Sequence, residues 1–474
     1  MHLRKVALIT AVVVVGATGA SVAAVAQATT TPPVAKGKSA SDLPIAQYLQ
    51  QTMDGLAFQD VLDLAPPTAA ASTLKTVDKD ATTSAQAATT AAAAQPISQQ
   101  PQIDATVLEL DSAGRIVSSG TVLMSPQYPH GVVVPVDTNH HTTAVRYRQW
   151  DDAGWYANKA QGTIDIVPGR ESAPLDFMSP YPASVLKLMV NFGVLRLVDQ
   201  GVIGLDDTYS YEPTTISSLC GPASSNTIRA YIDASLTQSS NAASCALVKM
   251  LWDHDAVNAL NQTFQDLGLE TLHLANTNPV NGGRWGNPVT MSSLDTAKLL
   301  TLINGAPGTL WTTPAGVAVT RSELSESSRE VFLTRLSQQG WNWMLSTTNY
   351  CGRGYPAAGI PQNTADRWLA ADGTMTVAGN YFGQDVRPCN EASEVTFMHK
   401  TGWVGNSGAD AGIVKSHGGT PKRQYVIAVF SNLGDQYQDA GRPATPTGVV
   451  PVEFTQKFAQ LGKAIDDYEK ACAS

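Results

Sequence analysis

A serine and a lysine three residues apart, Ser184 and Lys187, are the residues of this sequence best placed to do chemistry. The apolar run Val185–Val198 begins between them and predicts a buried helix. Residues three apart on a helix share a face, so the lysine amine can reach the serine hydroxyl. Burial disfavours the charged form of a lysine. A neutral amine beside a hydroxyl makes a nucleophile with its own base.

The same spacing occurs a second time, at Ser72 and Lys75. That copy lies in an Ala/Thr/Gln-rich stretch and continues into the polar sequence TVDKDATT, which offers nothing to bury the lysine. A Ser-x-x-Lys spacing is a weak signal by itself, and we interpret the second copy as chance. The apolar run is therefore what favours Ser184.

A second motif, Ser239–Asn241, lies between two predicted helices at 226–236 and 241–252. A similar Ser-Ser-Asn occurs at 224–226, and both copies can also be helix caps, since serine and asparagine favour that position. We favour the later copy because helices frame it on both sides. Its serine hydroxyl and its amide can then face the nucleophile.

A third motif, His399–Gly402, lies inside the strand-like sequence Val395–Val404. Lys400 and Thr401 on an edge strand can bind a carboxylate. Gly402 lets a substrate backbone approach closely, and such a substrate can add to the strand as an extra chain. Taken alone, the motif also fits an ordinary polar strand end.

In this order the three motifs resemble those of the penicillin-recognising serine hydrolases, which include class A β-lactamases and penicillin-binding DD-peptidases. The resemblance runs from about Thr143 to the C-terminus and is closest to the class A branch. The flanking sequences that support it are IDASLTQSSNAAS, PVTMSSLDTAKLL, ADAGIV and YVIAVFSN. In the first of these, Ser240 stands where the family usually has aspartate.

The resemblance implies a catalytic role for three side chains. Ser184 would be the acylated nucleophile and Lys187 its base or proton shuttle. Ser239 would relay a proton to the leaving nitrogen. The backbone N–H groups of Ser184 and Trp403 would form an oxyanion hole, a device worth roughly 3 kcal/mol per donor.

The resemblance also implies the substrate-binding residues. Asn241 would hold the side-chain amide of the substrate, and Lys400 and Thr401 would bind its carboxylate. Gly402 and Trp403 continue the same strand and complete the predicted binding site.

One residue departs from the family pattern. The sequence HLANTNPVN matches the family's omega loop, and Asn278 stands where class A β-lactamases have the glutamate that activates the deacylating water. An amide cannot take a proton from water at neutral pH. Glu270 lies upstream of the loop in this alignment. We therefore expect acylation to survive and deacylation to be slow.

The stretch near 304–395 is longer than the family usually has. We interpret it as a disulfide-pinned surface elaboration with a small core, and a lid over the site is the alternative. The chain has five cysteines. We predict the pairs Cys351–Cys389 and Cys220–Cys245, with Cys472 left over, although the sequence does not fix connectivity.

Strands are predicted from Ile103 onward and again near the C-terminus, with helices between them. One predicted strand, Gly162–Val167, leads toward Ser184. The expected fold is α+β: an antiparallel sheet from both chain ends, flanked by helices, with an all-helical lobe. The predicted middle helices follow Ser184 and cover NTIRAYIDASL, NAASCALVKMLW, AVNALNQTFQDL, LDTAKLLTLI and SSREVFLTRLSQQ.

The N-terminal segment predicts export. Residues 1–28 read as a signal peptide with basic residues, an apolar core and small residues, and an uncleaved membrane anchor is the alternative. Residues 29–101 predict a mostly disordered linker in which IAQYLQQTMDGLAFQDVLDL can form a short helix. Residues 102–142 predict a β-rich extension, and 143–474 the hydrolase domain.

Composition excludes several functions. The net charge of -9 and the lack of basic runs argue against nucleic acid as a partner. There is no HExxH and no CxxC, and the adjacent His140 and His141 would face opposite sides of a strand, so we expect neither metal nor cofactor. We expect a monomer that is secreted or associated with the cell envelope and has no membrane span after signal cleavage.

The predicted ligands are β-lactams or D-alanyl peptides of the cell wall. Two alternatives to a β-lactamase stay open. One is a DD-peptidase-like enzyme, because that group also works without the omega-loop glutamate. The other is a non-turnover protein that binds the cell wall or β-lactams through the same pocket.

Overall fold

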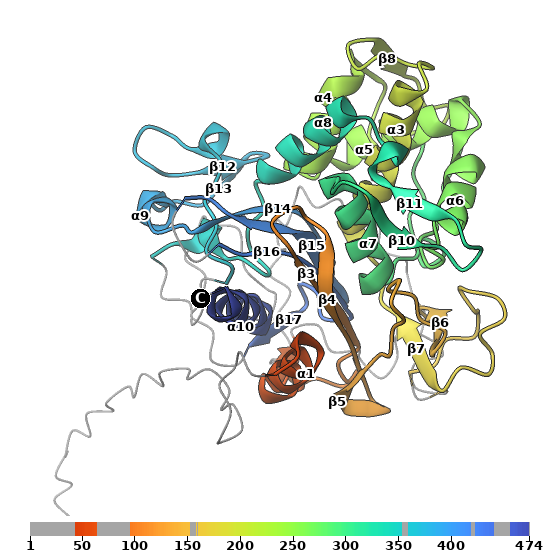
Figure 1. Ribbon diagram of the computed structural model, residues 1–474. Coiled ribbons are helices and arrows are strands. Elements are labelled where there is room, and N and C mark those ends of the chain that lie inside the picture. Colours follow the sequence, from red (N-terminus) through yellow and green to blue (C-terminus); the bar gives the residue numbers. More distant parts are fainter. Residues whose placement is uncertain are drawn as a thin grey trace, which may run out of the picture. The chain divides into compact units, whose positions relative to one another are not determined.

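The computed structural model describes residues 43–63, 95–151, 158, 160–352, 359–418, 422–439 and 456–473, and every structural statement below concerns these residues. Their centre is a six-stranded antiparallel sheet in the order β14-β15-β16-β3-β4-β5 (Figure 1). The strands are β3 (Ile103–Leu110), β4 (Ile116–Ser125), β5 (Tyr128–Val133), β14 (Val395–Val404), β15 (Ser407–Ser416) and β16 (Gln424–Ser431).

The middle strand β16 shows why this sheet carries structure on both faces. Successive side chains of a strand point to opposite faces. Val426, Ala428 and Phe430 belong to the core that the sheet shares with the helical lobe. Their neighbours Tyr425, Ile427 and Val429 belong to a second core on the other face. Because both faces of β16 are buried, its sequence is an almost continuous apolar run.

The helical lobe packs against the first of these faces. Its helices are α3 (Lys187–Asp199), α4 (Ile228–Thr237), α5 (Asn241–Asp253), α6 (Ala256–Asp266), α7 (Ser293–Asn304) and α8 (Glu326–Ser337). Helix α3 is buried on nearly all sides, as its apolar run predicts. At Gly193 an added Cβ would come within 2.7 Å of the Leu260 side chain, so glycine allows α3 and α6 to approach closely.

Two helices from the chain ends cover the other face of the sheet. They are α1 (Ile45–Gly55) and α10 (Lys457–Cys472), and their Tyr48 and Tyr468 rings stack with centroids 4.6 Å apart. The expected short helix inside 29–101 is thus confirmed. This part of the predicted linker is folded, because Ile45, Leu49 and Met53 form an apolar stripe that is fully buried. Residues 29–42 and 64–94 lie outside the described residues, as does the predicted signal peptide.

Two predictions about the strands need correction. The stretch 102–142 is not an extension of the hydrolase domain, since β3, β4 and β5 are half of the central sheet and β3 pairs with β16. Gly162–Val167 is not a strand, and its one β-bridge joins Asp165 to Arg148. The strand that leads to Ser184 is β7 (Leu175–Ser179), which pairs in parallel with β6 (Val145–Gln149).

The remaining elements are short. They are β1 (Val61–Asp63), β2 (Gln95–Pro96), β8 (Thr208–Tyr211), β9 (Ser224–Thr227), β10 (Thr309–Thr312), β11 (Ala318–Thr320), β12 (Thr376–Val377), β13 (Asn380–Tyr381), α9 (Arg387–Glu391) and β17 (Tyr437–Asp439). Within the described residues no helix is long and apolar enough to cross a membrane.

Both predicted disulfides are confirmed. Cys220 bonds Cys245 and Cys351 bonds Cys389, and Cys472 is free and exposed. The second bond lies in a small aromatic core within the stretch 304–395, formed by residues such as Trp341, Trp343, Tyr350 and Phe382. The expected fold class is also confirmed: an α+β fold with an antiparallel sheet from both chain ends and a helical lobe.

Candidate active site

Ser184 lies on a tight turn between a strand and a buried helix. A 3₁₀ turn, η2 (Ala183–Leu186), follows β7 and leads directly into α3, whose first residue is Lys187. Residues three apart eclipse one another in a 3₁₀ turn, which brings the serine and the lysine to one side. Ala183 has a φ of 47°, a left-handed value that non-glycine residues seldom adopt. Such strain is found most often at functional sites.

The Lys187 amine is the centre of a hydrogen-bond network. Its Nζ lies 3.0 Å from Ser184 Oγ, 2.7 Å from Ser239 O, 3.1 Å from Ser239 Oγ and 2.8 Å from Asn241 Oδ1. Lys187 is fully buried. Burial, and then the nearby charge of Lys400, lower the pKa of Lys187 well below that of an exposed lysine. The amine is therefore suited to exist in its neutral form and to accept a proton.

Ser239 connects the two buried lysines. Its hydroxyl lies 3.1 Å from Lys187 Nζ and accepts a hydrogen bond of 3.0 Å from Lys400 Nζ. Its φ of 59° is left-handed, and this conformation turns both its carbonyl and its hydroxyl toward Lys187. The next residue, Ser240, caps helix α5 through a hydrogen bond from Ala243 N. The family's aspartate position is thus filled here by a helix cap.

Lys400 supplies the second amine, from the edge strand β14. It is fully buried and donates 2.6 Å to Thr401 O as well as to Ser239. Burial lowers the pKa of Lys400 to about 7, and Asp410 opposes this shift. The hydroxyl of Thr401 is buried and has no hydrogen-bond partner among the described residues. A buried polar atom without a partner favours a ligand that can supply one.

Gly402 lies directly against the turn that carries the nucleophile. A Cβ added there would be 2.5 Å from Ser184 N and 2.8 Å from Val185 N. Strand β14 can approach the serine this closely only because position 402 has no side chain. The glycine thus sets the distance between the Ser184 turn and the strand that carries Lys400.

Gly402→Ala is expected to lower the rate of acylation at Ser184 by at least about tenfold, because a methyl group would push the turn away from β14. The second-order rate constant for reaction with a fluorescent penicillin measures this effect. Gly405→Ala, in the turn between β14 and β15, is the control, since its Cβ would meet only the side chains of Gln436 and Asp435. Equal rates for both variants and the wild type would contradict this reading of Gly402.

The structure brings the predicted residues together from four elements: Ser184 from η2, Lys187 from α3, Ser239 and Asn241 from the α4–α5 junction, and Lys400–Trp403 from β14. The competing copy at 224–226 lies apart from them in the strand β9, where it is largely exposed. The competing Ser72 and Lys75 lie outside the described residues.

Aromatic residues border the site in a way that spacing alone did not predict. The Trp285 ring lies 5.5 Å from Lys187 Nζ. The Trp403 ring packs against Trp343 and Trp341, with centroids 4.1 and 5.7 Å away. The last two residues come from the stretch 304–395, so this stretch borders the site.

Asn278 lies in a loop stabilised by its own hydrogen bonds. Its side-chain Oδ1 accepts 3.0 Å from Val280 N, and its backbone N–H donates 2.8 Å to Gly283 O. Glu270, the acid upstream in sequence, forms an ion pair of 2.8 Å with Arg170. Neither residue has a contact with Ser184 among those of the described residues.

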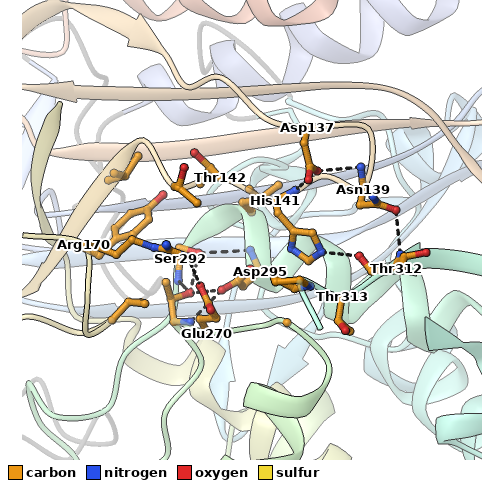
Figure 2. Close-up of a pocket in the computed structure, with 18 residues that line it drawn as sticks. Asp137, Asn139, His141, Thr142, Arg170, Glu270, Ser292, Asp295, Thr312 and Thr313 are labelled. Atoms are coloured by element: carbon orange, nitrogen blue, oxygen red, sulfur yellow. Dashed lines mark hydrogen bonds and ion pairs between the residues drawn. The ribbon is translucent and has the colours of Figure 1, made fainter. Parts of the chain in front are cut away.

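A separate cavity of about 380 Å³ lies between the loop 137–143, β6 and the start of α7 (Figure 2). None of its lining residues is a predicted site residue. Several of its polar side chains have partners within the cavity wall: Arg170 pairs with Glu270, and the His141 Nε2–H donates a hydrogen bond of 2.8 Å to the backbone carbonyl of Thr312.

Comparison with known protein families also points to the penicillin-recognising serine hydrolases. The model of a β-lactamase enzyme family matches residues 178–348, which include Ser184, Lys187 and Ser239–Asn241. No curated protein matches. The family match confirms the resemblance to the penicillin-recognising serine hydrolases over this segment.

The structural comparison also finds solved proteins of low sequence identity. A mutant of PBP-A, described as an acyl-enzyme complex with penicillin G, has 18% identity and a TM-score of 0.41, covering 78% of this chain and 90% of its own. A class A β-lactamase from Bacteroides cellulosilyticus has 13% identity and a TM-score of 0.40, covering 78% and 94%. A β-lactamase from Chitinophaga pinensis has 15% identity and a TM-score of 0.38, with the same coverage.

Proposed function

We propose that this protein is an exported serine hydrolase of the β-lactamase and penicillin-binding class, acylated at Ser184 by β-lactams or D-alanyl peptides. One observation carries the proposal: a buried Lys187 amine lies 3.0 Å from the Ser184 hydroxyl. The two disulfides fit an oxidising compartment and so support export.

In the proposed acylation the neutral amine of Lys187 takes the proton of Ser184 Oγ as that oxygen attacks the substrate carbonyl carbon. The carbonyl oxygen becomes an oxyanion, held by the backbone N–H groups of Ser184 and Trp403. The carbon–nitrogen bond then breaks. The leaving nitrogen receives a proton from Ser239, which is replenished by the lysine that took the first one. The acyl group remains as an ester on Ser184.

Substrate binding would use the polar groups around this centre. A substrate carboxylate would bind the ammonium of Lys400 and the Thr401 hydroxyl, which has no partner in the described structure. The Asn241 side chain, whose Oδ1 accepts from Lys187, has an amide nitrogen left to donate to a substrate carbonyl. The proposal therefore favours small acyl donors that carry a carboxylate.

We predict that acylation by penicillin G has a bell-shaped pH dependence whose alkaline limb is centred near pH 7. It should fall in acid as Lys187 becomes protonated and can no longer act as a base. It should fall in alkali as Lys400, with a pKa of about 7, loses the charge that attracts the carboxylate. Stopped-flow acylation rates across the pH range measure both limbs.

Lys400→Arg is the matched variant for this profile, because a guanidinium stays charged at all accessible pH values. Its alkaline limb should move to higher pH while the acid limb stays in place. An unchanged alkaline limb would contradict the role of Lys400 in binding the carboxylate.

We propose that deacylation is slow because Asn278 cannot activate water. Asn278→Glu should speed release of the penicilloyl group by at least about tenfold, because a positioned general base typically accelerates a reaction by more than that. Loss of bound fluorescent penicillin over time measures the release. Glu270→Gln is the control and should have no effect, since Glu270 is paired with Arg170. If Asn278→Glu releases the penicilloyl group no faster than the wild type, the omega loop is misassigned.

Intact-mass spectrometry after incubation with penicillin G tests the proposed function. A persistent added mass of one penicillin supports an acyl-enzyme with slow deacylation. Rapid loss of the adduct with release of hydrolysed product would indicate an efficient β-lactamase. A folded protein that never gains mass would overturn the proposal and favour a non-covalent binding protein.

A further inference from the structure

Three consecutive backbone carbonyls at the end of helix α4 are held by three consecutive residues of the stretch 304–395. Leu236 O accepts a hydrogen bond of 3.0 Å from the Gln339 side chain. Thr237 O accepts one of 2.7 Å from Gly340 N. Gln238 O accepts one of 2.9 Å from the Trp341 indole. The last carbonyls of a helix have no partner within the helix. Residues 339–341 therefore cap α4 from outside.

The residue that follows these carbonyls is Ser239. Its left-handed backbone, with a φ of 59°, is costly for a residue other than glycine, asparagine or aspartate. Such a conformation persists only where the surroundings fix the chain on both sides. On the far side Ser240 caps α5, and on the near side residues 339–341 hold the end of α4.

Two of these residues, Gln339 and Trp341, also contact the strand that carries Lys400. The Gln339 side chain lies 3.4 Å from His399 O. The Trp341 ring packs edge-on against Trp403, with centroids 5.7 Å apart and planes at 70°. Gln339 and Trp341 are 3% and 5% exposed, so they are fixed in place by packing. One segment thus joins the end of α4 to β14, the two elements on either side of the Ser239 hydroxyl.

We propose that residues 339–341 form a clamp that positions Ser239 between Lys187 and Lys400, with Trp341 as its principal positioning residue. The clamp rests on the proposed function, because it assigns a purpose to the Ser239 relay. The segment touches neither lysine amine in the described structure, and it acts through the carbonyl of Gln238 and the ring of Trp403.

The reason the position matters is geometric. The Ser239 hydroxyl lies 3.1 Å from the Lys187 amine, which would replenish its proton, and it accepts a hydrogen bond of 3.0 Å from Lys400, so the relay depends on where this hydroxyl is held. A displacement of about 1 Å can lower the rate of a reaction on the order of 100-fold. Releasing the Gln238 carbonyl should therefore slow acylation even though no group that touches the substrate has changed.

Trp341→Phe tests the clamp because it removes the indole N–H and keeps an aromatic ring. Trp311→Phe is the matched control: its indole, also in the stretch 304–395, donates a hydrogen bond of 2.8 Å to the backbone carbonyl of Leu267 at the end of α6. We expect Trp341→Phe to lower the first-order acylation constant for penicillin G by about 10- to 100-fold, with the dissociation constant of the first complex unchanged. Trp311→Phe should react like the wild type.

A second readout separates positioning from a general structural role. Because Ser239 contacts both lysines, its displacement should shift the acid limb of the acylation profile, which loss of stability would not move. Gln339→Met, which removes the donor to Leu236 O, should act in the same direction if Trp341→Phe proves poorly folded by circular dichroism.

The outcomes distinguish the clamp from the proposed function. A wild type that takes no label overturns both. A wild type that takes label, with Trp341→Phe and Gln339→Met reacting equally fast, overturns the clamp alone. An equal fall in Trp341→Phe and Trp311→Phe, or a change confined to the dissociation constant, also overturns it.

Discussion

Ser184→Ala is expected to abolish covalent capture of penicillin, so that the variant gains no mass under conditions in which the wild type is fully labelled. The reason is chemical: the serine oxygen is the atom that would form the ester, and no water or neighbouring group can take its place in a covalent adduct. Because Ser184 is only partly buried, the loss of its hydroxyl should leave the fold intact.

The second Ser-x-x-Lys in the chain provides the control for this experiment. Ser72→Ala should be labelled as fast as the wild type, since the sequence around Ser72 offers no apolar run to bury Lys75. Labelled Ser184→Ala protein, or labelling lost on Ser72→Ala, would show that the nucleophile lies elsewhere. Tandem mass spectrometry of the labelled peptide would then locate it.

The parts of the fold that the sequence predicted are those governed by local periodicity. The strand β14 was expected at Val395–Val404 and has those bounds in the structure. The apolar run after Ser184 became the buried helix α3. In both cases the pattern of apolar residues reports the local geometry and burial of one element.

The errors concern which elements come together. Strand β3 pairs with β16, more than 300 residues away, and no local pattern encodes that register. Residues 102–142 were consequently placed outside the domain. Gly162–Val167 does not form a strand, because it pairs with β6 at a single point. Gln149 N donates to Ile164 O and Ile166 N donates to Tyr147 O around the one bridge of Asp165 to Arg148, and the Ile164 side chain is 58% exposed.

The predicted site shows the same division. The proximity of Ser184 to Lys187 follows from a spacing of three residues, so it could be predicted from sequence. Lys400 and Ser239 are 161 residues apart in the sequence, so no local spacing predicts their contact. Its prediction depended on the order of the three motifs along the chain. The contacts that Trp285 and Trp341 make near the site could not be predicted, since aromatic residues in irregular segments have no periodicity that would indicate what they touch.

The second large effect is expected at Lys187. Lys187→Met keeps the apolar stem that fills the core and removes the amine, so the protein should fold and bind penicillin. Acylation should then fall on the order of 1000-fold, within the range lost when a general base is removed. Stopped-flow labelling gives the rate, and circular dichroism checks the fold.

Lys187→Arg distinguishes a base from a mere positive charge. An arginine keeps a cation near Ser184 Oγ but cannot give up its proton in a protein. If the amine acts as a base, Lys187→Arg should be as slow as Lys187→Met across the pH range. If the lysine served only to attract an anion, Lys187→Arg would keep most of the rate, and the low pKa that burial imposes on this amine would have no part in the chemistry.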